Sequence, residues 1–454
     1  MSKKIILVDN ELKLINHVLN DTDWIIEVLI TINKDNQYVE NDRVISIYSE
    51  EEFWNNRDLE YFDYTDLKYL WKAQLKMENT YNRFCSDFQM GKWNYYRSYA
   101  LVRKIFTTHR IDFVIVKGLN HGYGWDRMIT EYATFLDIAS YNIEGSLYKK
   151  RIIYDNKNKK LLERQHNNVN VNEVVFYPQE VDQEVTFGKT FWERVYKFFY
   201  NHFGSLGLDF IKCVRYKNNG KDRFGNTIKD RFKMLKKIKK TKKYYDQISA
   251  EIDTTQKYIC YALHYEPEAS VAGRADIMDS QLVVIQMLAN NLPEGWVLYV
   301  KEHTIQYWIN YSKRYFNLHG LSVFKTKRMY EEISKMKNVK LLKSDSDNRL
   351  IIENCQAIAT MSGTIGIEAA TYKKPVLIFA AERAIYKHMN GYYKISSNEE
   401  CKNAIKEILE GKECVYDNYT EICNRYLIDF SNEVCGYWNA VQIINSEILR
   451  IEQN

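Results

Sequence analysis

The stretch Ala359–Phe379, ATMSGTIGIEAATYKKPVLIF, decides the fold that we expect for this chain. Apolar runs of strand length stand at its two ends, Ala357–Met361 and Val376–Phe379. Between them lie a small polar sequence and a short helical segment, which must end before Pro375 because proline cannot continue a helix. Strand, turn, helix and strand in this order form the unit of a parallel sheet that is buried on both faces.

The turn in this unit, Ser362-Gly363-Thr364, has the composition of a phosphate site. It follows the carboxyl end of a strand and precedes the amino end of a helix, where backbone N–H groups and the helix dipole favour an anion. Glycine permits close approach to the backbone, and Ser and Thr add hydroxyl groups. The alternative is an ordinary strand-to-helix turn with a Ser or Thr N-cap.

Length, charge and cysteine usage exclude several classes of protein. The 454 residues are enough for two or three domains, and a net charge of +5 argues against a dedicated nucleic-acid binder. The sequence has no apolar run of membrane-spanning length, and Met1–Asn10 reads as the start of a strand, not as a signal peptide. The eight cysteines form no CxxC pair, so we expect no zinc or redox motif and a reduced, cytoplasmic location.

The first part of the chain alternates strand-like and helix-like segments, which predicts an α/β domain over residues 1–186. A helix is expected over Tyr64–Met77. A glycine-bearing loop, Lys117–Trp125, follows a strongly apolar strand. The expected strands are Lys4–Val8, Trp24–Ile32, Arg43–Tyr48, Asp112–Val116 and Ile138–Ile143, the last followed by a turn at Glu144-Gly145-Ser146.

Residues 187–256 differ in composition and are expected to form a helical, basic connecting segment. Lys229–Tyr245, KDRFKMLKKIKKTKKYY, is densely cationic. One interpretation is a solvated helix face or linker. The other is contact with an anionic membrane surface or an anionic glycan acceptor.

A second α/β domain is predicted over residues 257–430, and a C-terminal helix over 431–454 that packs back toward the first domain. Three of its loops, His264–Ser270, Lys301–Thr304 and Ser362–Thr364, directly follow apolar strands. In an open parallel sheet such loops line one ligand-binding crevice. The candidate binding residues are His264, Glu266, Glu268, Ser270, Lys301, His303, Ser362, Gly363, Thr364 and Glu368.

These candidates suit different parts of a nucleotide. Lys301 and His303 fit a phosphate as cationic or hydrogen-bonding groups, and the glutamates fit ribose hydroxyls or a base edge. Taken alone, a histidine such as His303 is more often a structural residue than a ligand.

Three ordered segments carry a resemblance to a known family: HYEPEAS at His264–Ser270, LPEGWVLYVKEH at Leu292–His303 and MSGTIGIEAATYKKPVLIF at Met361–Phe379. They resemble the bacterial capsule polysaccharide biosynthesis family, which includes β-Kdo transferases and is similar to GT-B glycosyltransferases. The resemblance implies an α/β, GT-B-like fold with two Rossmann-like domains facing a cleft. It also implies a nucleotide-sugar donor, preferably a CMP-sugar, held by the second domain, with His303, Ser362 and Thr364 at the phosphate.

The sequence departs from the family pattern in two places. Thr304 stands where a proline is usual, and Lys373 precedes Lys374-Pro375 where a glycine is usual. The resemblance implies an inverting transfer that needs neither a metal nor a cofactor besides the donor. The base would come from the first domain.

The residues that we predict as the catalytic base lie in the first domain. Glu144, beside Gly145, matches the family's acidic residue next to glycine, although the family's aspartate is missing here. His121 is the second candidate and Asp155 a weaker third. The alternative for each is a turn or capping residue.

Several functions remain open on this sequence. The leading one is a transferase that adds a sugar to a cell-surface polysaccharide or a lipid-linked acceptor, at or near the inner membrane. The others are a nucleotide-sugar 2-epimerase, a CDP-polyol phosphotransferase and a non-catalytic capsule assembly or export component.

Overall fold

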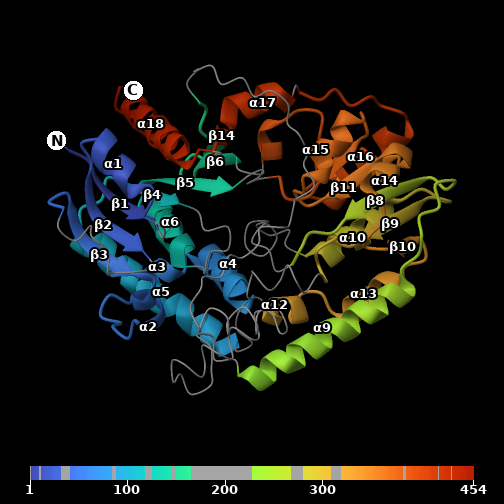
Figure 1. Cartoon of the computed structure of the whole chain (residues 1–454), viewed down its shortest axis with the longest axis horizontal. Helices are drawn as coiled ribbons and strands as arrows, with labels where there is room; N and C mark the ends of the chain where they lie inside the picture. Colours follow the sequence, from blue (N-terminus) through green and yellow to red (C-terminus); the bar gives the residue numbers. More distant parts are fainter. Residues whose placement is uncertain are drawn as a thin grey trace, which may run out of the picture.

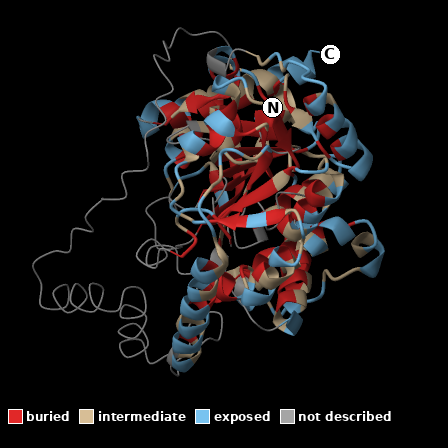
Figure 2. Cartoon of the chain, turned by 90° about the vertical axis from the view of Figure 1, so that its right-hand side faces the viewer, coloured by how far each residue is buried: buried red, intermediate tan, exposed pale blue. Residues whose placement is uncertain are grey.

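The computed structural model describes residues 2–9, 12–31, 41–83, 88–117, 125–145, 150–164, 227–266, 280–307, 318–381, 385–417, 419–430 and 432–453. Two sheets lie in separate halves of the molecule (Figure 1). Buried residues concentrate in the strands and on the helix faces that cover them (Figure 2).

The first sheet has eight strands and is parallel except at one edge. Its strands are β1 Lys4–Val8, β2 Ile25–Thr31, β3 Val44–Ser49, β4 Phe113–Lys117, β5 Ala139–Gly145, β6 Lys150–Asp155, β7 Lys160–Leu161 and β14 Ile428–Asp429. Their order is β14-β6-β5-β4-β1-β2-β3, with β7 paired to β6. β1 to β5 run parallel, whereas β6 is antiparallel to β5 and to β14.

Helices cover both faces of this sheet, which explains why its central strands are continuous apolar runs. Val114 and Val116 of β4 pack with the buried residues of one helical layer, and Phe113 and Ile115 pack with those of the other. The first layer consists of α4 Trp71–Asn82, α5 Phe88–Thr108 and α6 Trp125–Phe135; the second consists of α1 Ile15–Asp21 and α18 Glu433–Glu452.

The C-terminal segment returns to the first sheet. β14 pairs with β6, and the buried side chains of α18 join the same core cluster as β1 and β4 (Figure 1). The chain therefore leaves the first half, builds the second and ends against the first.

The second sheet contains six parallel strands. They are β8 Tyr258–Ala262, β9 Val297–Lys301, β10 Val339–Leu342, β11 Ala357–Thr360, β12 Val376–Ile378 and β13 Tyr393–Lys394. Their order is β10-β9-β8-β11-β12-β13. From β8 the chain steps outward to β10 and then returns to place β11 beside β8. β1 to β4 do the same in the first sheet, and this is the strand order of a doubly wound fold. The predicted α/β class with two Rossmann-like domains is confirmed.

Helices also cover both faces of the second sheet. On one side lie α9 Ile228–Ile248, α10 Gln281–Asn291, α12 Leu318–Val323, α13 Lys327–Ser334 and α16 Asn398–Leu409. On the other lie α14 Asn348–Asn354, α15 Ile365–Thr371, the 3-10 turn η2 Ile385–His388 and α17 Tyr419–Tyr426. The core on this second side includes Ile152, Tyr154 and Leu161 of the first sheet, so apolar packing joins the two halves.

Two local predictions were wrong. Tyr64–Met77 is not one helix: α3 Tyr64–Leu67 and α4 are separated at residues 68–70. Glu144 and Gly145 lie in β5 and not in a turn, because antiparallel pairing with Ile152 and Arg151 of β6 extends the strand. Residues 187–226 of the predicted helical segment 187–256 lie outside the described residues.

Candidate functional site

In the second sheet, strands are added from β8 toward one edge and from β11 toward the other edge. β8 and β11 are hydrogen-bonded neighbours, and the strand order reverses between them. In doubly wound sheets, ligands bind beyond the carboxyl ends of such strands. The chain segments found at this point are the one after β8, with His264, and the one after β11, with Ser362. The carboxyl end of β9, with Lys301, lies next to β8. Three of the predicted loops therefore begin at one edge.

His264 fixes the two central loops to each other. Its Nε2 atom accepts a hydrogen bond from the backbone N–H of Ser362 at 3.1 Å and lies 3.3 Å from the hydroxyl of Thr360. On the other side, the backbone N–H of His264 donates to Oε1 of Gln281 at 2.8 Å. The imidazole is thus a structural link at the point where a ligand is expected.

The ring of His264 is neutral near physiological pH. The residue is only 8% exposed, and burial, with a smaller contribution from His303 and Lys325, lowers its pKa to about 3. A backbone N–H can only donate, so Nε2 must be the unprotonated nitrogen and the proton resides on Nδ1. Among the described residues none accepts a hydrogen bond from Nδ1, so this N–H can serve a ligand.

The Ser-Gly-Thr turn is closely packed against this histidine. A Cβ on Gly363 would stand 2.9 Å from the Thr360 hydroxyl and 3.4 Å from Nε2 of His264, so glycine is needed for close approach. The hydroxyl of Tyr386 donates to the Gly363 carbonyl at 2.6 Å and so fixes the backbone of the turn. Ser362 is half-buried and Thr364 is exposed, which leaves their hydroxyls at the edge of the sheet.

Lys301 and Glu368 occupy the other side of the same edge. Lys301 is buried at the end of β9, and its Nζ donates to Oδ1 of Asn348 at 2.8 Å. Burial lowers the pKa of Lys301, and burial raises the pKa of Glu368 although Lys301 opposes this shift. A half-buried carboxyl group thus lies close to a buried ammonium group.

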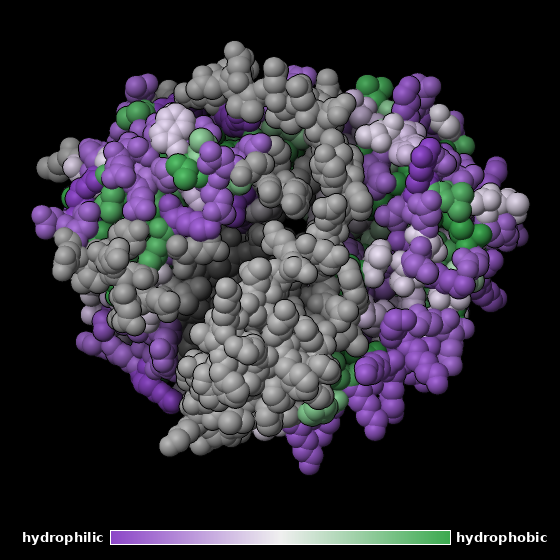
Figure 3. All heavy atoms as spheres, in the orientation of Figure 1, coloured by the Kyte–Doolittle hydropathy of each residue, from purple (hydrophilic) through white to green (hydrophobic). Residues whose placement is uncertain are grey.

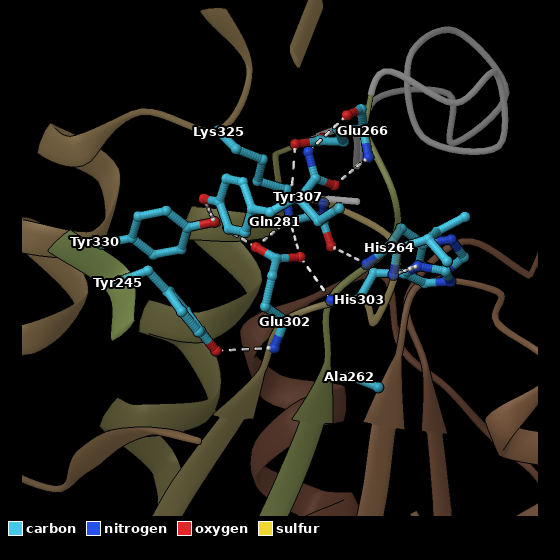
Figure 4. Close-up of polar contacts among 12 residues, drawn as sticks. Tyr245, Ala262, His264, Glu266, Gln281, Glu302, His303, Tyr307, Lys325 and Tyr330 are labelled. Atoms are coloured by element: carbon cyan, nitrogen blue, oxygen red, sulfur yellow. Dashed lines mark hydrogen bonds and ion pairs between the residues drawn. The ribbon is translucent and has the colours of Figure 1, made fainter. Parts of the chain in front are cut away.

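His303 follows β9 and lies next to His264 (Figure 4). Its backbone N–H donates to the Glu302 carboxylate at 2.7 Å, and its Nδ1 accepts from the N–H of Ile305 at 3.4 Å. The residue is exposed at the surface. Desolvation and the charges of Lys325 and Lys301 lower the pKa of His303, although the exposure of this residue keeps the desolvation partial.

A buried charged network beneath these loops was missed by sequence reasoning. Glu302 is completely buried, and its carboxylate accepts from Nζ of Lys325 at 3.2 Å and from the hydroxyl of Tyr330 (Figure 4). Tyr307 donates to Tyr330 at 2.6 Å, and the backbone N–H of Glu302 donates to the Tyr245 hydroxyl of α9 at 3.2 Å. Nothing in the local sequence around Lys325 marks it as the partner of Glu302.

Two buried glutamines hold the loop after β8. Gln281, at the start of α10, accepts from His264 as described, and Gln306 makes a two-way clamp on Glu266. In this clamp the N–H of Glu266 donates to Oε1 of Gln306 at 2.9 Å and its carbonyl accepts from Nε2 at 2.8 Å. The backbone of each central loop is therefore fixed by a buried side chain, which favours a preformed site.

The predicted binding residues divide into three groups. Those at or beside the carboxyl edge of the second sheet are His264, Lys301, His303, Ser362, Gly363, Thr364 and Glu368. Glu266 is buried and lies 4.0 Å from Lys325, inside the charged network. Glu268 and Ser270 lie outside the described residues.

Glu144, the first predicted catalytic residue, belongs to the first sheet. Glu144 is buried near the carboxyl end of β5, and its Oε1 accepts from Nδ2 of Asn142 at 3.2 Å. Asn156 in turn donates to Oδ1 of Asn142 at 3.1 Å, which makes a polar chain along this strand. His121 lies outside the described residues.

Asp155 has the contacts of a turn residue. It pairs with Tyr141 near the amino end of β5, away from Glu144, and its two carboxylate oxygens accept from the N–H of Asn158 at 3.0 Å and from Nδ2 of Asn158 at 2.7 Å. These bonds hold the connection between β6 and β7.

The reversal point of the first sheet carries a buried ion pair that the sequence did not single out. Asp9 follows β1, and Lys117 ends the neighbouring β4. Their charged atoms are 3.6 Å apart, and Asp9 also accepts from the N–H groups of Leu14 and Ile15 at the start of α1. Nζ of Lys117 lies 4.7 Å from the ring of Tyr437 on α18, so this pair ties the C-terminal helix to the sheet.

The described part of the chain contains no group of three or more His, Cys, Asp or Glu side chains arranged as metal ligands. The side-chain hydrogen-bonding groups described at the edge of the second sheet are imidazoles, hydroxyls, the Lys301 ammonium and the Glu368 carboxyl group.

No protein-family model and no curated protein matches this chain. Among solved structures it is similar to UDP-GlcNAc 2-epimerase from Methanocaldococcus jannaschii, with 14% identity, 98% of this chain and 100% of that chain covered, and a TM-score of 0.26. It is also similar to Anabaena HepE in complex with UDP-glucose (10% identity, 99% and 100% covered, TM-score 0.27) and to the calicheamicin glycosyltransferase CalG4 (8%, 97% and 99%, 0.21). Identities and TM-scores this low carry no information on the reaction.

Proposed function

We propose that this protein is a glycosyltransferase that moves a sugar from a nucleotide-sugar donor onto a cell-surface polysaccharide or a lipid-linked acceptor. The observation that carries the proposal is the convergence of neutral His264, exposed His303 and the Ser362–Thr364 turn at the reversal point of a parallel sheet. Such a set of donors suits the phosphate of a nucleotide.

The hydrogen-bond donors at this edge of the sheet match what a departing nucleotide needs. As the bond from the anomeric carbon to the phosphate oxygen breaks, negative charge grows on that oxygen. The Nδ1–H of His264, the Ser362 and Thr364 hydroxyls and the positive field of Lys301 can stabilise this charge. Gln281 and Glu302 fix the backbone of the loops that carry His264 and His303. The hydrogen-bond donors of these loops therefore need little rearrangement when the negative charge develops.

The acceptor hydroxyl requires a base, and Glu144 is the residue that we propose for it. Its carboxylate lies near the carboxyl end of a first-sheet strand, and Asn142 orients one of its oxygens. A base on the face opposite the leaving phosphate gives inversion at the anomeric carbon. His121 stays a second candidate. The CMP-sugar, as opposed to another donor, is proposed from the sequence resemblance alone.

A product assay tests this function. Purified protein is incubated with CMP-, CDP-, UDP- and GDP-sugars, with and without a lipid-linked glycan acceptor, and released nucleotide is measured. A transferase releases nucleotide only when acceptor is present and forms an elongated acceptor in equal amount. No release from any donor in the presence of acceptor would refute the proposal.

A second candidate is a nucleotide-sugar 2-epimerase. The half-buried Glu368 beside Lys301 favours it, because a carboxyl group with a raised pKa can take and return a proton on the sugar. An epimerase would convert the donor to its 2-epimer without acceptor, which chromatography of the recovered nucleotide-sugar detects. Glu368→Gln would abolish that conversion.

A further inference from the structure

Helix α9 carries more positive charge than the whole protein. Ile228–Ile248 contains eight lysines, one arginine and two aspartates, a net charge of +7, whereas the net charge of the chain is +5. The rest of the chain is therefore slightly acidic, and the cationic character is a local property of this helix. In Figure 1, α9 lies along the outer edge of the second half.

One face of α9 is used for packing. Arg231, Ile238, Thr241 and Tyr245 are buried, and the half-buried Met234 and Ile248 continue the same seam at spacings of three and four residues. Tyr245 also bonds to the Leu342 carbonyl and to the buried Glu302. This face fixes the helix to the second sheet and leaves the opposite face outward.

The opposite face is a row of lysines. Lys229, Lys233, Lys236, Lys240 and Lys243 follow one another at spacings of four and three residues, and all are exposed. We call this row the lysine stripe. It extends over about 21 Å of a single helix, at 1.5 Å per residue. Figure 3 shows hydrophilic side chains over this edge of the molecule.

Within the described part of the chain, most lysines of the stripe have no ion-pair partner. Lys233 lies 3.6 Å from Asp230. Among the described residues, no carboxylate lies within ion-pair distance of Lys236, Lys240 or Lys243. Like charges placed this close repel one another, and this repulsion is relieved when a surface of opposite charge approaches.

We propose that the lysine stripe of α9 docks this protein on the anionic surface of a lipid bilayer. Three features favour a bilayer. The stripe is straight and rigidly held, which fits a flat surface. Its charges are all ammonium groups, which bind as point charges, while the guanidinium of Arg231 is buried. Phe232 stands beside the stripe with 56% of its surface exposed, and an aromatic side chain there gains from insertion at the lipid interface.

The docking is peripheral and electrostatic. No described helix is long and apolar enough to cross a bilayer. Surface charges are screened over about 8 Å at physiological ionic strength, so binding must weaken steeply as salt is added. The proposal does not depend on the transferase reaction, because it concerns a helix face that the candidate site does not use.

Vesicle sedimentation tests the proposal with the full chain. Vesicles of equal parts phosphatidylglycerol and phosphatidylcholine are compared with pure phosphatidylcholine at low and high salt. The variant Lys236→Ala/Lys240→Ala removes two stripe charges. Lys402→Ala/Lys406→Ala is the matched control, because these lysines are also exposed and four residues apart, on α16.

We expect wild type and the control to bind the anionic vesicles, with binding lost at high salt and absent on pure phosphatidylcholine. The stripe variant should bind about 30-fold more weakly, from the contribution expected of each lysine near an anionic surface. Equal binding by the two variants, or no binding by wild type, would overturn the proposal. Binding to soluble alginate without binding to vesicles would overturn it in favour of a glycan. No nucleotide is present, so failure here leaves the transferase proposal untouched.

Discussion

Protonation of His264 is the perturbation for which the structure gives the clearest magnitude. The folded protein holds this imidazole with a pKa of about 3, against an ordinary value of 6.5. That difference corresponds to roughly 5 kcal/mol against adding a proton in the folded state. The penalty arises because the ring is buried, with smaller contributions from the nearby His303 and Lys325.

The sign of the effect on stability follows from linkage. Since the pKa of His264 is lower in the folded chain than in the unfolded chain, the unfolded chain binds the extra proton between the two values. The contribution of this histidine to stability is complete above about pH 6.5 and is lost as the pH falls toward 3. At pH 5 the loss is about 2 kcal/mol.

Nuclear magnetic resonance of the histidine ring nitrogens measures this directly. The chain has nine histidines, and His264→Gln identifies the signal by its disappearance. We expect Nε2 of His264 to keep the chemical shift of an unprotonated acceptor, and Nδ1 that of a protonated nitrogen, from pH 8 to pH 5. A titration midpoint near 6.5, or a proton on Nε2, would refute the reasoning about the central link of the site.

Two further predictions separate buried structure from chemistry. Lys325→Met leaves the completely buried Glu302 without its ion pair and should lower the free energy of unfolding in urea by about 3–5 kcal/mol. Lys335→Met removes an exposed ion pair with Glu332 and should lower it by less than about 0.5 kcal/mol. Equal losses would show that the buried pair stabilises the fold no more than the exposed pair does. Glu144→Gln should abolish sugar transfer while donor binding persists, and Asp155→Asn should lower thermal stability by about 1 kcal/mol without changing turnover per folded molecule. Full activity of Glu144→Gln would remove this residue as the base.

The fold was largely predictable because its parallel strands are buried on both faces. Lys4–Val8 has the predicted bounds, and the other parallel strands that were predicted differ by one or two residues at one or both ends. The antiparallel edge was missed. β14 is two residues long, and β6 is recognisable only through its pairing with β5, which also extends that strand through Glu144.

The candidate site was predictable only in its outermost layer. His264 and Ser362 directly follow apolar strands, and that position marks the edge of a parallel sheet. Lys325 lies 23 residues beyond Glu302, and Lys117 lies far along the chain from Asp9. Such pairs form only when the tertiary structure brings their strands and loops together, so no local pattern could reveal them.

Nucleotide binding to wild type and to His303→Ala tests the central claim most directly. Both proteins are melted with and without CMP, CDP, UDP and GDP. His303 is exposed at the surface, so we expect the two proteins to unfold at nearly the same temperature without ligand. One nucleotide, CMP by our proposal, should stabilise wild type by about 2.7 kcal/mol at a hundredfold excess over its Kd and should stabilise His303→Ala much less. If no nucleotide stabilises wild type while a known GT-B glycosyltransferase responds, or if His303→Ala responds equally, the edge of the second sheet is not the nucleotide site.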